Sequence, residues 1–588
     1  MARYLGKETT RVDGMAKVTG KAKYAAEFQI PHLTYGFIVL STTARWRITQ
    51  IDPRAAEASA GVIKVFTHLN AGKLGKPPAA DASPTWAWPL QSDQVFFNGQ
   101  PIALVVAETY EQARHAARLV QVSYQAQPHE TNVATLLDRA KPAPQEAPPR
   151  GNPQAAMQAA SVKVQSEYRI PIEHHNPMEP HAAIAFWEGD QLTIFDKTQN
   201  VYGVQQHLSQ GLGVPAGNIR VVSPFVGGAF GASLKPNYYP SLTALAAREI
   251  KRPVKVVFTR AQMFTGHGYR PETIQKVALG AAPDGKLQAI IHEAFHNTSS
   301  FESFSDNTTG FLKQVYACPN LHAPLKIAAT DLATPTWMRA PGAVSGMFAL
   351  ESAMDELAYA LKIDPLELRL INYAEVDPES GKPFSSKALR ECYRLGAEKF
   401  GWSKRNPEPR SMRDGNLLVG WGMASSVWGA MQMPASARVT YRADGTASVA
   451  SATSDIGPGT YTVMTMIAAE FLGLTLEKVK FELGDTDQPR APAQGGSWTT
   501  SSVGSAVRGA ALTITEKLLS LANQDAGSPL RGASIDEVEM FENRLRLGMP
   551  LQADPTVQFA ISSDPASLSQ YGVCKEELTL EDRVFDSP

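Results

Sequence analysis

The amino-acid sequence predicts an α+β protein with more than one domain. Its 588 residues are too many for a single hydrophobic core. Short runs rich in valine, isoleucine and aromatic residues, which are typical of strands, occur between stretches whose apolar residues have helical spacing. The hydrophobic fraction of 43% and the charged fraction of 19% are those of an ordinary globular protein. We therefore expect several packed domains that each combine a sheet with helices.

The first expected domain, residues 1–135, mixes strands and helix. The strands are expected at 35–40, 62–66, 100–107 and 120–124, and a helix is expected at 109–119. The next segment, 136–160, contains five prolines between Pro142 and Pro153. Its composition predicts an extended, Pro/Ala-rich linker that is poorly suited to a core.

Two further mixed domains are expected at residues 161–405 and 406–588. Within the first of them, strands and helices alternate, and a proline-containing segment near 405–415 marks its end. The expected strands are 219–223 and 254–258, and the expected helices are 241–250 and 345–361.

Charge and cysteine content exclude several classes of protein. The net charge of −1, without a block of like charges, does not indicate nucleic-acid binding. No run of about 18 apolar residues predicts a membrane span. The polar first twenty residues do not resemble a secretory signal, so a cytoplasmic location is expected, with export to the periplasm alongside a partner as the alternative. Cys318, Cys392 and Cys574 are too far apart to predict a disulfide framework or an iron–sulfur cluster.

Arg339 is the candidate catalytic residue. It lies in the segment Trp337–Gly342, where Pro341 and Gly342 predict a turn directly before the helix at 345–361. An arginine stays charged at physiological pH and offers a planar fork of donors suited to an oxyanion or a carboxylate. A surface salt bridge is the alternative for this arginine judged alone.

Three glycine-rich loops are candidate phosphate sites. They lie at residues 225–231, 455–461 and 494–502, each between an expected strand and an expected helix. Glycine lets a ligand approach the backbone closely, and a helix N-terminus directs free amides toward an anion. The alternative is three ordinary turns with capping residues. No loop matches the Rossmann fingerprint or the Walker P-loop, which makes a nicotinamide or ATP site unexpected.

A group of histidines suggests a metal site as one alternative. His174, His175, Glu179 and His181 lie within eight residues of one another. Their spacing matches neither a helical histidine pair nor a zinc finger, so the other alternative is a polar wall of a cleft.

Taken together, these segments resemble the large, molybdenum-cofactor-binding subunit of the xanthine oxidase/aldehyde oxidase family of molybdenum hydroxylases. The branch that looks closest is the bacterial aldehyde oxidoreductases built from separate subunits. Residues 11–24 are similar to the start of the hammerhead domain of that family, and the resemblance covers roughly residues 8–545. The other motifs follow in the family's order: Met178–His181, Thr198–Asn200, Gly227–Gly231, Met338–Gly342 and Asp455–Gly459.

The resemblance implies a hammerhead-type domain at 1–135, a first molybdopterin-binding domain at 161–405 and a second one at 406–588. The second domain is expected to be truncated, because no counterpart of the family's C-terminal glutamate, its catalytic base, is found. The implied cofactor is molybdenum–molybdopterin, often a cytosine dinucleotide in bacteria, with the metal held by the pterin dithiolene and not by side chains. Iron–sulfur and FAD groups are expected on partner subunits.

The resemblance also assigns site residues. Gln199 corresponds to a glutamine close to the molybdenum oxo group, and Arg339 to an arginine that stabilises developing negative charge. Leu234 lies where some purine-oxidising relatives have an acid, which favours an aldehyde. The remaining implied cofactor contacts are Gly228, Ala229, Phe230, Gly457, Gly459, Gly496, Ser497, Trp498, Thr499 and Thr500.

The implied reaction is hydroxylation of an aldehyde, or of an N-heterocycle, with water; an aldehyde becomes a carboxylic acid. Three alternatives stay open. The chain could be a truncated, non-catalytic remnant. It could be half of a split enzyme that a separate C-terminal chain completes. It could also be a phosphate-ligand-binding protein without redox chemistry.

Overall fold

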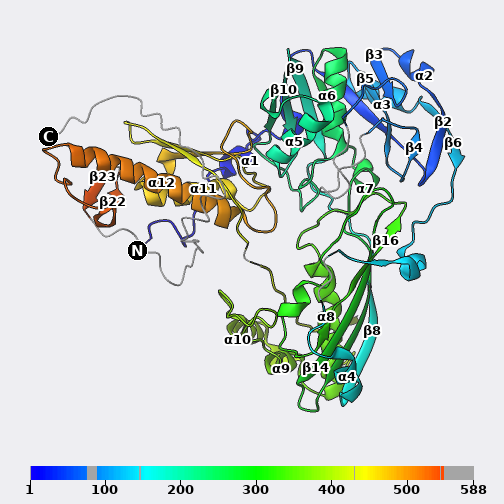
Figure 1. Cartoon of the computed structure of the whole chain (residues 1–588), viewed down its shortest axis with the longest axis vertical. Helices are drawn as coiled ribbons and strands as arrows, with labels where there is room; N and C mark the ends of the chain where they lie inside the picture. The colour runs from blue at the N-terminus through cyan, green and yellow to red at the C-terminus, as the bar shows by residue number, and fades with distance from the viewer. Residues whose placement is uncertain (1, 76–88, 145–147, 430, 543, 548–588) are drawn as a thin grey trace. The chain divides into compact units, whose positions relative to one another are not determined.

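The structure, a computed structural model, describes residues 2–75, 89–144, 148–429, 431–542 and 544–547 (Figure 1). The chain divides into two units. Unit 1 comprises residues 1–128, 175–267 and 430–588, and unit 2 comprises residues 129–174 and 268–429. Each unit contains both sheet and helix, which confirms the predicted α+β class. No helix in the described part of the chain is both long and apolar enough to cross a membrane.

A seven-stranded mixed sheet forms the centre of unit 1, in the order β11-β10-β9-β12-β1-β5-β3. Strand β5 (Pro101–Ala107) is buried at every position, as expected of a continuous apolar run inside a sheet. Strands from the first expected domain and from residues 182–257 thus share one sheet, with β1 parallel to β12. The other bounds are β1 Thr34–Leu40, β3 Val62–Thr67, β9 Ala182–Glu188, β10 Gln191–Asp196, β11 Ile219–Val222 and β12 Val254–Val257.

Two helices pack against strands of this sheet. Helix α5 (Val201–Leu212) packs against β11, and α6 (Tyr238–Ile250) against β9 and β12. Helix α6 begins three residues before the predicted start, where Asn237 accepts a hydrogen bond from the Tyr238 amide at 2.8 Å. Smaller elements of this part are α1 Gly14–Val18, η1 Ala25–Glu27, β2 Trp46–Asp52, α2 Arg54–Glu57, β4 Gln94–Val95, α3 Tyr110–Ala117, β6 Gln121–Ala126, η3 Ala216–Asn218 and α7 Gln262–Thr265.

The rest of unit 1 is a small sheet packed against two helices. Helices α11 (Thr460–Leu472) and α12 (Thr499–Gln524) lie side by side (Figure 1). They approach closely at Gly504, where a Cβ atom would lie 2.8 Å from the Ile467 side chain. The remaining elements are β19 Arg438–Tyr441, β20 Ala447–Ala450, η6 Leu476–Lys478, β21 Val479–Glu482, η7 Ile535–Glu537, β22 Val538–Phe541 and β23 Arg544–Leu547.

Unit 2 is built on a second sheet, in the order β7-β16-β14-β13-β8. Helix α8 (Ala343–Leu361) packs against β8 and β13, and its buried face includes Met354 and Leu357. The strands are β7 Lys141–Pro142, β8 Val162–Ile170, β13 Thr273–Ala281, β14 Leu287–Ser299, β15 Leu321–His322, β16 Leu325–Thr330, β17 Arg413–Asp414 and β18 Leu417–Leu418. The other helices are η2 Val133–Arg139, α4 Pro153–Ala159, η4 Phe311–Gln314, α9 Pro365–Ile371, α10 Leu389–Phe400 and η5 Trp402–Lys404.

The segment 136–160 is not an extended linker in its described part. Strand β7 pairs with β16, and Ala143 is buried in a small core cluster with Ala294 and Leu325. Helix α4 starts at Pro153, a first-turn position that proline tolerates because it has no amide to leave unpaired. Proline at a helix start and on an edge strand is compatible with a core, so the expectation from composition is wrong here.

Candidate functional site

Gln199 lies where loops of unit 1 meet. It follows β10, precedes α5 and is 2% exposed. Its side-chain oxygen accepts a hydrogen bond from the Gly231 amide at 3.2 Å, and its side-chain nitrogen donates to the Gln494 carbonyl at 2.7 Å. The Gln494 amide in turn donates to the Gln199 carbonyl at 2.9 Å. One side chain therefore joins the first candidate loop to the third.

The second candidate loop is bonded to the same group. The hydroxyl of Ser454 donates to the Thr198 carbonyl at 3.4 Å, and the side-chain nitrogen of Gln494 donates to the Thr460 hydroxyl at 3.1 Å. All three glycine-rich loops thus come together around Gln199 and Gln494. Sequence patterns predict the loops individually, but not this convergence.

The backbone of the first loop turns sharply beside Glu179. Gly228 has a φ of 88° and Phe230 a φ of 59°, whereas Ala229 lies outside the left-handed region. Alanine is therefore accommodated at that position, while the left-handed Phe230 costs about 1–2 kcal/mol. The Glu179 carboxylate accepts from the Gly227 amide at 2.7 Å, and burial raises the pKa of that carboxyl. Glu179 supports this loop.

The second loop is shaped by an aspartate. The Asp455 carboxylate accepts from the Gly457 amide at 2.8 Å and from the Gly459 amide at 3.5 Å. Both glycines have left-handed backbones, with φ of 117° and 101°. Aspartate followed two residues later by glycine is a known turn pattern, so this role was recognisable in the sequence.

The third loop contains the remaining predicted contacts. Gly496 and Ser497 have φ of 53° and 61°, and the indole nitrogen of Trp498 donates to the Ala493 carbonyl at 2.6 Å. Thr499 and Thr500 begin helix α12. All the predicted cofactor-binding residues therefore belong to unit 1.

These loops have the properties that a phosphate-bearing ligand requires. Neither α11 nor α12 has a side-chain hydrogen bond at its N-cap, so the first-turn amides and the positive end of each helix dipole are available to an anion. The buried side-chain oxygens of Gln494 and Thr499 have no hydrogen-bond partner among the described residues. A Cβ atom at Gly457 would meet nothing within 4 Å, which leaves room beside the second loop.

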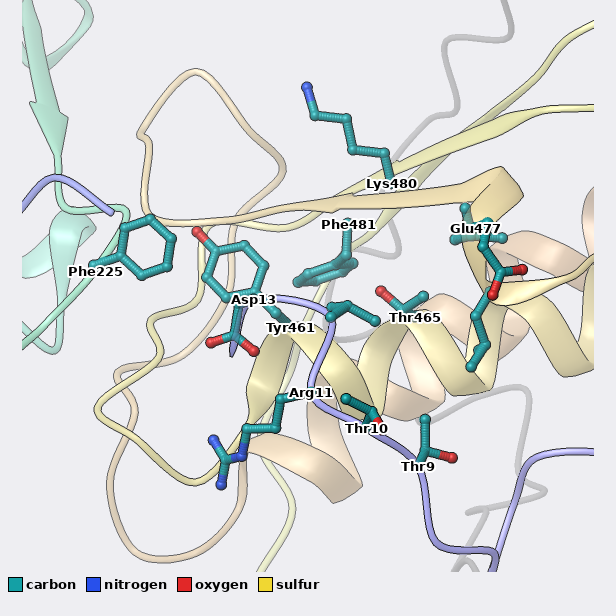
Figure 2. A pocket seen from close by; sticks show the side chains of 13 residues that line it. Thr9, Thr10, Arg11, Asp13, Phe225, Tyr461, Thr465, Glu477, Lys480 and Phe481 are labelled. Atoms are coloured by element: carbon teal, nitrogen blue, oxygen red, sulfur yellow. The ribbon is translucent and has the colours of Figure 1, made fainter. Parts of the chain in front are cut away.

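A groove of about 790 Å³ lies next to the second loop (Figure 2). Arg11, Asp13, Phe225, Tyr461 and Phe481 are among the residues that line it. None of the predicted cofactor-binding residues lines this groove, although Phe225 and Tyr461 belong to the first and second candidate loops.

Arg339 lies in unit 2, in the predicted turn, and helix α8 begins four residues later. Its side chain is exposed, and its carbonyl accepts a hydrogen bond from Arg270 at 2.9 Å. Arg270 is 3% exposed and forms an ion pair with Glu173 at 2.6 Å. Gly342 has a φ of 72°, and a Cβ atom there would lie 2.3 Å from the Asn307 carbonyl, so only glycine fits. The role of Arg339 beside the cofactor loops stays a prediction.

The candidate histidines come from both units. His174 belongs to unit 2, whereas His175 and His181 are buried in unit 1. The ring of His181 packs against those of Tyr239 and His267, with centroids 5.3 and 4.9 Å away, and burial lowers its pKa well below the usual value. In the ranges that the structure describes, no three His, Cys, Asp or Glu residues are arranged to hold a metal ion.

Converging glycine loops at two helix starts without side-chain caps suit a protein that holds a phosphate-bearing cofactor. Models described as "Molybdopterin cofactor-binding domain" match residues 138–373 and 395–579. A model described as "Aldehyde oxidase and xanthine dehydrogenase, a/b hammerhead domain" matches residues 19–128. The second of the cofactor-domain matches extends past residue 545, so the predicted limit of the resemblance is wrong; residues 548–588 lie outside the described part of the chain.

Relatives agree with these matches. The chain is 38% identical to the aldehyde oxidoreductase molybdenum-binding subunit PaoC of Escherichia coli (strain K12), over 89% of this chain and 71% of the relative. It is 31% identical to the putative xanthine dehydrogenase molybdenum-binding subunit XdhA of the same strain, over 87% of this chain and 72% of the relative. The structure superposes on aldehyde oxidoreductase from Desulfovibrio gigas with a TM-score of 0.76 and 26% identity, covering 87% of this chain and 60% of that chain.

The chain belongs to the family of molybdenum-binding subunits of aldehyde oxidoreductases and xanthine dehydrogenases. The predicted family, its hammerhead and molybdopterin-binding domains and the molybdenum–molybdopterin cofactor are confirmed. The chain spans 60% of the length of the solved D. gigas chain.

Proposed function

We propose that this chain is the cofactor-binding subunit of an oxidoreductase that hydroxylates aldehydes, or N-heterocycles, with water, so that an aldehyde becomes a carboxylic acid. The observation that carries the proposal is the convergence of three glycine-rich loops around Gln199 and Gln494. The names of PaoC and of the D. gigas protein support aldehydes as the substrate class.

In this proposal the cofactor is held by backbone amides more than by side chains. The starts of α11 and α12 would bind the phosphate-bearing part, with Thr499 and Thr500 as hydroxyl donors. Gln199 and the loop at Gly228–Phe230 would surround the reactive end, and the pterin, not a side chain, would hold the metal. When bound, the cofactor supplies a two-electron oxidation of the substrate carbon with oxygen from water.

Arg339 would bind the carbonyl oxygen of the substrate and stabilise the negative charge that develops there. Its backbone is fixed by the buried Arg270 while its side chain stays exposed, which suits a group that must reach a ligand. Leu234 gives the third loop an apolar neighbour, since its side chain would lie 2.7 Å from a Cβ atom at Gly495. An apolar residue there favours an aldehyde over a purine.

The electrons would leave through partner subunits. Cys318 is buried and Cys392 is exposed, and neither has a second thiol with which to build an iron–sulfur cluster in the described ranges. We therefore propose separate chains that hold iron–sulfur clusters and FAD.

The test is the Arg339→Ala variant of the complex expressed with its neighbouring reading frames. Loss of one oxyanion donor should lower kcat by about 100-fold or more. Molybdenum and pterin content should stay at the wild-type level, because Arg339 is assigned to the substrate and not to the cofactor. Arg339→Lys keeps the charge but loses the planar fork, so an intermediate rate is expected.

Arg413→Ala is the matched control, since it removes an exposed arginine of the same unit. An equal loss of molybdenum in Arg339→Ala would contradict the assignment of Arg339. If the purified wild-type complex contained neither molybdenum nor pterin, that result would contradict the proposed function as a whole.

A further inference from the structure

Residues 3–13, here called the N-terminal strap, run along helix α11 of unit 1. Figure 2 shows Thr9, Thr10 and Arg11 of the strap beside this helix, with Asp13 close to Tyr461. The strap lies next to the second candidate loop (residues 455–461). The two are far apart in the chain, since the hydrogen bond from the Val12 amide to the Thr462 hydroxyl joins residues 450 positions apart. The strap contacts residues near both ends of α11.

One end of the strap is anchored on a buried carboxylate. Glu470, near the end of α11, is 7% exposed and accepts hydrogen bonds from the Arg3 amide at 2.8 Å and from the Tyr4 amide at 2.7 Å. Tyr4 and Leu5 pack against the core of α11 and α12. Hydrogen bonds to a charged acceptor are stronger than those between neutral groups, so this end of the strap is firmly held.

The other end of the strap is bonded to the cofactor loop itself. The Arg11 guanidinium donates to the Gly457 carbonyl at 2.8 Å, and the Val12 amide donates to the Thr462 hydroxyl at 3.1 Å. Lys17, four residues after the end of the strap, forms an ion pair with Asp13 and lies 4.0 Å from Asp455. The contacts thus fall on both sides of Gly459, the residue directly before α11.

The same region also contacts the first loop. The Lys17 ammonium lies 5.6 Å from the centre of the Phe225 ring, and the rings of Phe225 and Tyr461 are 5.3 Å apart. The Tyr461 hydroxyl donates to the Pro224 carbonyl at 2.8 Å. Movement of the strap would therefore be transmitted to two of the three loops.

The second loop needs such support. A Cβ atom at Gly457 would meet nothing within 4 Å, so little packing restrains that residue. Both of its glycines are in the left-handed region, and glycine has the largest conformational freedom to lose. Pro458 has no amide with which to make a further hydrogen bond.

We propose that the N-terminal strap is a positioning element for the cofactor and that Arg11 is its key residue. By fixing the Gly457 carbonyl, Arg11 holds the 455–460 turn in the conformation that directs the first-turn amides of α11 toward the ligand. The identity of the ligand rests on the proposed function, whereas the ordering of the turn does not.

The experiment is hydrogen–deuterium exchange of the peptide that covers residues 455–463, in the purified complex. Loss of one ordinary hydrogen bond should make the Gly457 and Gly459 amides of Arg11→Ala exchange roughly fivefold faster. Arg11→Lys, which keeps a donor, should restore much of the protection. Lys480→Ala is the control, because Lys480 lines the same groove but forms its ion pair with Glu482. The thermal unfolding midpoint should be unchanged in all three variants.

Unchanged exchange in Arg11→Ala, or the same increase in Lys480→Ala, would overturn the proposal. The second readout is pterin released during gel filtration, expected to be roughly fivefold faster from Arg11→Ala. Faster exchange with unchanged pterin release would overturn the role toward the cofactor. If the wild-type complex holds no pterin, the proposed function fails, and the exchange data alone then decide whether Arg11 orders the turn.

Discussion

Two buried cations, one in each unit, are paired in opposite ways. In unit 2, Arg369 is fully buried and is paired at 2.8 Å with both Glu351 and Asp355. Glu351 also accepts from the Tyr316 hydroxyl and from the Ser425 amide, at 2.5 and 2.7 Å. In unit 1, Lys197 is 1% exposed, and its ammonium has no hydrogen-bond partner in the described part of the chain.

The difference indicates which of these two cations serves folding and which lies beside the candidate site. Burial raises the pKa of Asp196 to about 7, and it lowers the pKa of Lys197 to about 8 against the attraction of Glu179. These two residues lie directly before Thr198 and Gln199, and Glu179 holds the first cofactor loop. Incompletely paired buried groups are costly and gather at functional sites, whereas a completely paired group such as Arg369 serves folding.

The largest loss of stability is expected for the Arg369→Met variant, which changes unit 2. The substitution leaves the Glu351 carboxylate buried without its cation, so the free energy of unfolding of that unit should fall by about 3–5 kcal/mol. Urea denaturation followed by hydrogen exchange of α8 peptides measures it. Arg390→Met is the control, because Arg390 and Glu375 form an exposed pair, with 55% and 70% of their side chains accessible. Equal effects in the two variants would contradict the assignment of Arg369 to folding.

The next largest effect involves Lys197, and it is a change in how the stability of unit 1 depends on pH. Because its pKa is lowered from 10.5 to about 8, the folded chain releases a proton between these values that the unfolded chain keeps. The stability of unit 1 should therefore rise with pH from about 8 to 10.5, by up to roughly 3 kcal/mol, and Lys197→Met should lose that rise.

Urea denaturation of unit 1 at several pH values between 7 and 10.5 measures the Lys197 effect. Lys480→Met, an exposed lysine of the same unit, should keep the wild-type slope. A Lys197→Met variant with the wild-type slope would show that the ammonium is not the group that titrates.

Local patterns predict much of this fold. The continuous apolar run at 100–107 and the helical spacing at 345–361 correspond to β5 and α8. The long strand β14 escapes prediction because it contains His292 and His296, both fully buried. His292 is accommodated by a hydrogen bond to Gln275 on the neighbouring strand at 2.9 Å, a partner that no local pattern reveals.

The individual segments of the site can be predicted from the sequence, but the contacts that join them cannot. Glycine loops before helices, and an arginine in a turn, can be recognised from residue type and spacing alone. The bond between Gln199 and Gln494 joins residues 295 positions apart, and the strap contacts join still more distant ones. Such contacts depend on how the domains fold onto one another, and a single sequence encodes them in no periodic form.

The smallest loss of stability is expected for an ion pair that is exposed to water. Arg220 pairs with Asp485 at 2.6 Å and with Asp487 at 2.9 Å, which joins β11 to the turn after β21 in unit 1. Half of the Arg220 side chain is accessible to water, so screening should keep the loss of stability in Arg220→Ala below about 1 kcal/mol. Raising the salt concentration should remove most of that loss. A salt-independent loss comparable to that of Arg369→Met would show that this pair behaves as a buried one, and that the contrast between the units does not depend on burial.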